Sequence, residues 1–99
     1  MDNNKTLSKF LTIESYLQSL FCECSIETKK FPHTNNYLVR VAGSNGRLKH
    51  HMIFHFQFVD ENTSDEVIEK LKDWRLEDVV KKAGEKVVFI SKDGIRVLW

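Results

Sequence analysis

The side chains that most invite a chemical role in this sequence are its cysteines and histidines. Cys22 and Cys24 are the only cysteines, and His51 and His55 are four residues apart. Sulfur and imidazole are the ligands that zinc prefers. On a strand, however, positions 51 and 55 are about 13 Å apart, too far to share one metal ion. We therefore predict no metal site and interpret the cysteines as small unpaired thiols on the core side of a strand.

A second candidate is Glu27-Thr-Lys29, which matches the short acid-x-lysine element of some metal-dependent nucleases. Such a site needs another acid on a neighbouring strand to complete a magnesium shell. The expected neighbouring strands, 37–42 and 48–59, contain no acid. The acids at positions 60–66 surround the start of an expected helix, where the helix dipole favours negative charge.

Nucleophilic and phosphate chemistry find no support either. No serine or cysteine lies in a glycine-flanked elbow, and Gly43-Ser-Asn-Gly46 is too short for a phosphate cradle. We predict no catalytic residue and no cofactor, and we interpret the chain as a protein that is not an enzyme.

Length and composition indicate one globular domain that spans residues 1–99. Hydrophobic residues make up 41% and charged residues 29% of the chain, which is typical of a folded protein. The net charge of +1 results from 15 basic and 14 acidic residues. Binding to a polyanion would therefore need local segregation of these charges.

The apolar run 7–21 is interrupted by polar residues, so it predicts neither a membrane span nor a signal peptide. Cysteines two apart on a strand have poor disulfide geometry, and unpaired thiols are typical of a reducing compartment. We expect a cytoplasmic protein without membrane contact.

Helical spacing of apolar residues predicts a first helix over 7–21, with Thr6 as its N-cap and Glu14 as the one acid in the apolar stripe. Alternation predicts a strand over 22–29. Thr63-Ser-Asp-Glu66 is a capping box that opens another helix. The apolar faces before and after Trp74-Arg75 are rotated relative to each other, so this helix should break there, and Gly84 should end its second part.

Two hairpins complete the pattern. Asn45-Gly46 favours a two-residue type I′ turn between strands 37–42 and 48–59, with Ser44 opposite Arg47. The resulting register pairs Val39 with Met52 and Leu38 with Ile53. Segment 86–99 predicts a second hairpin that turns at Lys92-Asp-Gly94, with a two-residue or three-residue loop. Its continuously apolar first strand, 87–90, is typical of an inner strand.

The element order is therefore α-β-β-β-α-α-β-β. It predicts an α+β fold: a two-layer sandwich of a mostly antiparallel five-stranded sheet with helices on one face. The hairpin register places Phe54, Phe56 and Phe58 on the core face, which leaves no strand aromatic outside to stack on bases.

The same register assigns a mixed basic and apolar set to the outer face of the sheet. These candidate partner-binding residues are Leu38, Arg40, Arg47, Lys49, His51, Ile53 and His55. An apolar pair ringed by basic groups favours a binding or regulatory module that contacts another protein or a second copy of itself. A nucleic-acid-binding domain that uses the basic hairpin is the alternative, and a solvated face without a partner has the same pattern.

Overall fold

The computed structural model describes residues 2–31, 33, 34 and 36–98, with side chains described from Lys9 onward. It contains four helices and five strands in the described ranges. In chain order they are α1 (Asp2–Leu20), β1 (Ser25–Lys30), β2 (Tyr37–Ala42), β3 (Leu48–Phe54), α2 (Phe56–Asp60), α3 (Ser64–Asp73), α4 (Leu76–Ala83), β4 (Val87–Ser91) and β5 (Gly94–Leu98).

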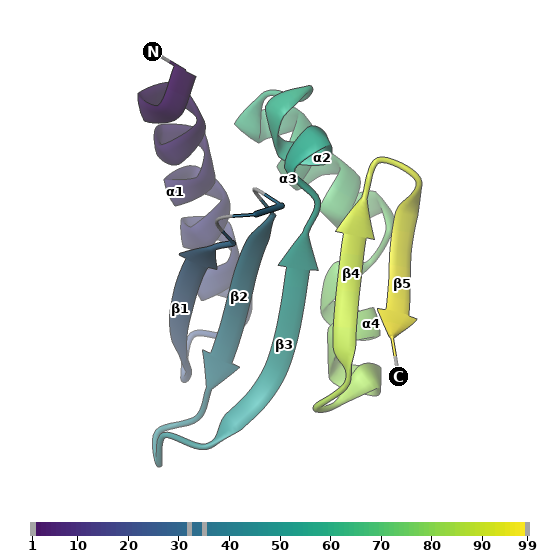
Figure 1. Ribbon diagram of the computed structural model, residues 1–99. Helices are drawn as coiled ribbons and strands as arrows, with labels where there is room; N and C mark the ends of the chain where they lie inside the picture. Colours follow the sequence, from purple (N-terminus) through teal and green to yellow (C-terminus); the bar gives the residue numbers. More distant parts are fainter. Residues whose placement is uncertain (1, 32, 35, 99) are drawn as a thin grey trace.

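The predicted α+β class is confirmed. The strands form one sheet in the order β1-β2-β3-β4-β5, and every neighbouring pair is antiparallel except the parallel pair β3–β4. Helices α1, α3 and α4 lie behind the sheet in Figure 1, and no helix of the described residues covers the nearer face. β4 lies between β3 and β5, as its continuous apolar sequence predicts.

The core fills the space between the sheet and the helices. α1 contributes Phe10, Ile13 and Leu17 at the spacing that puts side chains on one face of a helix. Phe10 stacks on Tyr37 of β2, with the ring centroids 4.4 Å apart, and meets Phe54 of β3 edge to face. This aromatic contact fixes α1 across the first half of the sheet.

The first helix and strand differ from the predicted boundaries. The helical backbone begins at Asp2, so Thr6 lies inside α1 rather than at its N-cap. β1 begins at Ser25, because the Gln18 side chain donates hydrogen bonds to the carbonyls of Phe21 and Cys24 and holds this segment in a turn. Cys22 is therefore exposed in the turn, not in the core, and both cysteines are free thiols.

The long strand predicted over 48–59 is wrong beyond Phe54. His55 caps α2, because its Nδ1 accepts a hydrogen bond from the backbone N–H of Gln57 at 3.3 Å. Both Phe58 and Val59 are buried. Adjacent residues point to opposite faces of a strand, so a helical turn is needed to bury this pair together. Phe56 consequently lies in α2 and not on a sheet face.

The predicted capping box and helix break are confirmed. Thr63 accepts from the N–H of Glu66, and the Glu66 carboxylate accepts from the N–H of Thr63. The chain breaks between α3 and α4 at Arg75, which adopts the left-handed conformation at φ 56° and ψ 52°. Gly84, at φ 63°, ends α4.

The predicted hairpin register is confirmed along most of β2–β3, with Leu38 opposite Ile53 and Val39 opposite Met52. The predicted type I′ turn, however, is wrong. Gly43 N–H bonds to Arg47 O, so Ser44 does not face Arg47, and of the loop residues only Gly46 has positive φ, at 78°. A bulge then shifts the register between Val41 and Ala42. The loop and the bulge each shift the pairing by one residue, and the two shifts cancel.

The second hairpin has the shorter of the two predicted loops. Ser91 pairs with Gly94, so Lys92 and Asp93 form a two-residue connection. Gly94 has a φ of 125°, which glycine adopts without steric cost.

Candidate surface on the uncovered face of the sheet

The uncovered face of the sheet, called the outer face below, is defined by the strand register. One row of partnered residues crosses the whole sheet: Lys29, Leu38, Ile53, Phe89 and Arg96. The next row contains Glu27, Arg40, His51, Val87 and Leu98. Cationic ends thus flank an apolar centre in the first row.

Leu38 and Ile53 lie together at that centre, as the sequence predicts. Leu38 is only 7% exposed although no helix covers it, so its neighbours on the outer face shield it from water. Ile53 is half-buried. Leu38 therefore contributes little accessible surface, and the apolar surface open to solvent lies farther along the row, toward β4 and β5.

Arg47 and Lys49, two of the predicted hairpin residues, lie apart from this apolar centre. Arg47 is exposed, and its N–H donates to the Asn45 side chain at 3.0 Å. Lys49 is the extra residue of the bulge and has no partner position on β2. Its Cε lies beside Gly43, where it would be 2.9 Å from an added Cβ. The structure therefore does not join Arg47 and Lys49 to the apolar row.

Arg40 and His51 are direct cross-strand partners. His51 is half-buried, and its buried Nε2 has no hydrogen-bond partner in the described part of the chain. Burial lowers the pKa of His51 below its ordinary value of 6.5, and the neighbouring Arg40 cation lowers this pKa further. His51 is thus held in its neutral form more strongly than a solvated histidine.

His55 lies at the outer face as the N-cap of a helix and not, as predicted, as a strand residue. It caps α2, and its ring stacks on Phe56 at 4.8 Å and meets Phe89 at a centroid distance of 6.1 Å. His55 therefore borders the apolar centre from the end of β3.

Two hollows open on this face and share Phe31 in their walls. The larger, called the Phe89 hollow below, has a volume of about 400 Å³. Its lining consists of Phe31, His33, Thr34, Asn36, Ile53, Phe89 and Leu98. The smaller, called the Arg40 hollow, has a volume of about 200 Å³ and is lined by Glu27, Lys29, Phe31, Leu38 and Arg40.

Three apolar lining residues were missed by the sequence interpretation: Phe31, Phe89 and Leu98. Phe89 belongs to a continuously apolar strand, whose faces are assigned only by its parallel pairing with β3. Phe31 lies in a segment with turn chemistry. The outer face therefore does carry aromatic side chains, which corrects the prediction that it has none.

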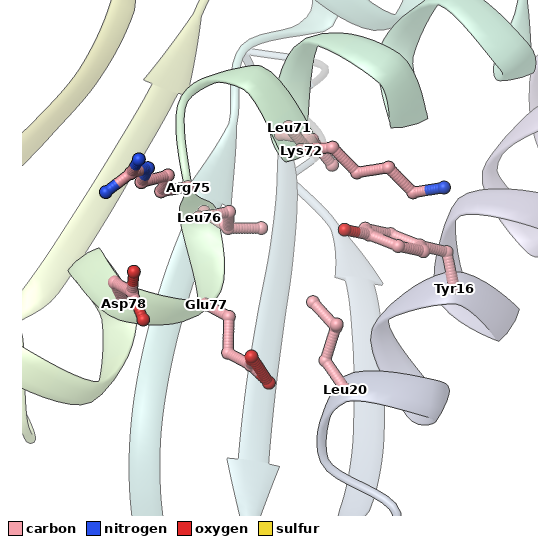
Figure 2. Close-up of a pocket in the computed structure, with 8 residues that line it drawn as sticks. All are labelled: Tyr16, Leu20, Leu71, Lys72, Arg75, Leu76, Glu77 and Asp78. Atoms are coloured by element: carbon pink, nitrogen blue, oxygen red, sulfur yellow. The ribbon is translucent and has the colours of Figure 1, made fainter.

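Another hollow lies on the helix side, between α1 and the α3–α4 junction, with a volume of about 250 Å³. Figure 2 shows Tyr16 reaching from α1 toward this junction. Burial, followed by the charge of Glu77, raises the pKa of Tyr16. Lys72 and Arg75 line the hollow together with Glu77 and Asp78, so its charges balance and select neither a cation nor an anion.

Across the described ranges, no three histidine, cysteine or acidic side chains are grouped to hold a metal ion.

Glu14, the acid in the apolar stripe of α1, is half-buried and accepts a hydrogen bond from Thr28 at 3.2 Å. None of the helices in these ranges combines the length and the apolar character that a membrane span requires.

Comparison with protein-family models, with curated proteins and with solved structures found no match for this chain.

Proposed function

We propose that this protein is a non-enzymatic binding or regulatory module that contacts another protein through its outer face. The observation that carries the proposal is the Phe89 hollow, an apolar-walled depression of about 400 Å³ on a face that no helix covers. Apolar surface at the centre with charged groups around it is the usual composition of a protein-binding surface.

An exposed apolar residue supports this assignment. Leu98 is 38% exposed at the rim of the hollow. It belongs to β5, an edge strand whose second edge pairs with no other strand in the described chain. A partner on the outer face would remove Leu98 from water, which stabilises the complex by about 25 cal/mol per Å² of apolar area.

A matched pair of variants tests the proposal. Leu11, on α1, is 55% exposed and lies far from the outer face in the fold, so Leu11→Asp is the control for Leu98→Asp. We expect the wild type and Leu11→Asp to capture the same proteins from an extract of the native host, in amounts measured by mass spectrometry. Leu98→Asp should lose them. Equal capture by both variants would remove the support for the outer face.

A second candidate function, nucleic-acid binding, is favoured by the charge of the strands and by the outer aromatics. Arg40 and Lys29 could contact phosphates, and Phe31 or Phe89 could stack on a base. Anisotropy of a labelled single-stranded RNA tests it. Tight binding that falls steeply with salt and is lost when Arg40, Arg47 and Lys49 are all changed to alanine would favour this function over the first.

A further inference from the structure

Charge is strongly segregated between the two layers of this protein. Of the fourteen acidic residues in the sequence, only Glu27 lies in a strand. The strands also contain five cationic residues: Lys30, Lys49 and, in the rows of the outer face, Lys29, Arg40 and Arg96. The net charge of +1 for the whole chain is therefore the sum of a basic sheet and an acidic helix layer. A partner that approaches the sheet meets a positive field.

The two hollows of the outer face combine this charge with apolar surface. Phe31 separates the Phe89 hollow from the Arg40 hollow and belongs to both walls. In the Arg40 hollow, two cations, Lys29 and Arg40, stand against the single acid Glu27. An apolar subsite and a cationic subsite are therefore neighbours.

We infer that the outer face binds an acidic peptide segment, with an aromatic or large aliphatic side chain in the Phe89 hollow and a nearby carboxylate beside Arg40 and Lys29. This inference rests on the proposed function and adds the chemistry of the partner. Arg40 suits the role because its guanidinium forms paired hydrogen bonds with a carboxylate.

Charge argues against a second copy of this chain as the occupant. If two copies met through their outer faces, Lys29, Arg40 and Arg96 of one copy would face the same cations of the other. Such like-charge contacts oppose association. An acidic segment meets the same cations favourably.

The apolar side chains that line much of the Phe89 hollow, Phe31, Ile53, Phe89 and Leu98, argue against a nucleotide base. Asn36 Oδ1 already accepts from the N–H of Phe56 at 3.1 Å, and Thr34 Oγ1 accepts from the N–H of Asn36 at 3.3 Å. A base in this hollow would bury its polar edges beside Ile53 and Leu98, and unsatisfied polar groups are costly to bury. An aromatic side chain without polar edges avoids this cost.

Selection of a random linear peptide library on the full chain tests the inference. We expect enriched peptides to pair an aromatic or large aliphatic residue with nearby aspartate or glutamate. Fluorescence anisotropy of one enriched peptide should show affinity that falls with salt. Arg40→Glu should weaken its binding by about fivefold or more, and Glu27→Gln, which removes the competing acid, should strengthen it about twofold.

The Leu98→Asp and Leu11→Asp variants distinguish a failure of this inference from a failure of the proposed function. If enriched peptides bind wild type, lose binding with Leu98→Asp, and carry no excess of acid, the inference fails and the proposed function stands. If binding survives Leu98→Asp, both fail. If no peptide is enriched, the inference fails, and the capture experiment with Leu98→Asp and Leu11→Asp decides the proposed function. An RNA that displaces the acidic peptide and binds more tightly would also overturn the inference.

Discussion

Arg40 and His51 face each other across β2 and β3 on the outer face, where the imidazole is half-buried and its Nε2 lacks a hydrogen-bond partner among the described residues. Burial is the larger cause of the lowered pKa of His51, and the Arg40 cation is the second. Protonation of His51 would therefore add charge to a face that is already basic.

This relationship predicts a pH dependence of stability. The unfolded chain binds the His51 proton at a higher pH than the folded chain, so stability should fall as the pH drops through 6.5 toward the lowered folded pKa. Urea unfolding on either side of this range should show a smaller pH effect in His51→Gln than in the wild type. Identical pH effects in the two proteins would contradict the assignment.

The effect of the Arg40 cation on the pKa of His51 can be tested separately by NMR titration of the His51 ring. Arg40→Gln removes the neighbouring cation, so the pKa of His51 should rise toward its ordinary value. It should stay below that value, because burial remains. Lys92→Gln, a charge change at an exposed position in the β4–β5 turn, lies at the far end of β4 from Val87, the strand partner of His51, and should leave the pKa of His51 close to that of the wild type.

The α3–α4 junction predicts a stabilising substitution. Arg75 has a φ of 56° and caps α4 without a side-chain hydrogen bond. This conformation costs a non-glycine residue about 1–2 kcal/mol, and it costs glycine less. We expect Arg75→Gly to raise the free energy of unfolding by about 1 kcal/mol. The control, Glu69→Gly inside α3, should lower it by about 1 kcal/mol. A loss of stability in Arg75→Gly would show that its side chain matters more than its backbone.

The loop of the first hairpin gives a prediction that distinguishes the observed turn from a type I′ turn. Gly46 has positive φ, and a Cβ added there would meet no other atom within 4 Å. Gly46→Ala should therefore cost about 1 kcal/mol of stability from backbone strain alone, and Ser44→Ala should be nearly neutral. In a type I′ turn Asn45 would also have positive φ, and Asn45→Gly would be nearly neutral because both residues suit that position. In the observed loop Asn45→Gly should be destabilising, because it removes the hydrogen bond to Arg47.

Much of the fold was predictable because local signals and burial agree. The rotated apolar faces around Trp74 predict the break that Arg75 makes, and the Thr63–Glu66 capping box starts α3. The β2–β3 register was correct although the predicted turn was not, because burial of Val39 and Met52 on one face excludes a slip by one residue. Local turn chemistry is a weaker constraint than the core.

The remaining features depend on contacts between distant segments. The end of β3 depends on the His55 cap and on the bond from its N–H to Ile90 O of β4, and neither is visible in the alternating pattern of residues 55–59. The place of Phe89 on the outer face depends on the parallel pairing of β4 with β3. The predicted site therefore included Leu38 and Ile53 at the centre of the surface. It missed Phe89 and Leu98, which form the more accessible part of that surface.

The proposed contact between the outer face and a protein partner is tested most directly by photo-crosslinking in cells of the native host. A photoreactive phenylalanine analogue replaces Leu98 at the Phe89 hollow or Leu11 on α1, two exposed positions on opposite layers. We predict a discrete protein adduct from position 98 that is missing from position 11 and is reduced in yield by Arg40→Glu. Adducts of equal yield from both positions, or none from position 98, would contradict the account.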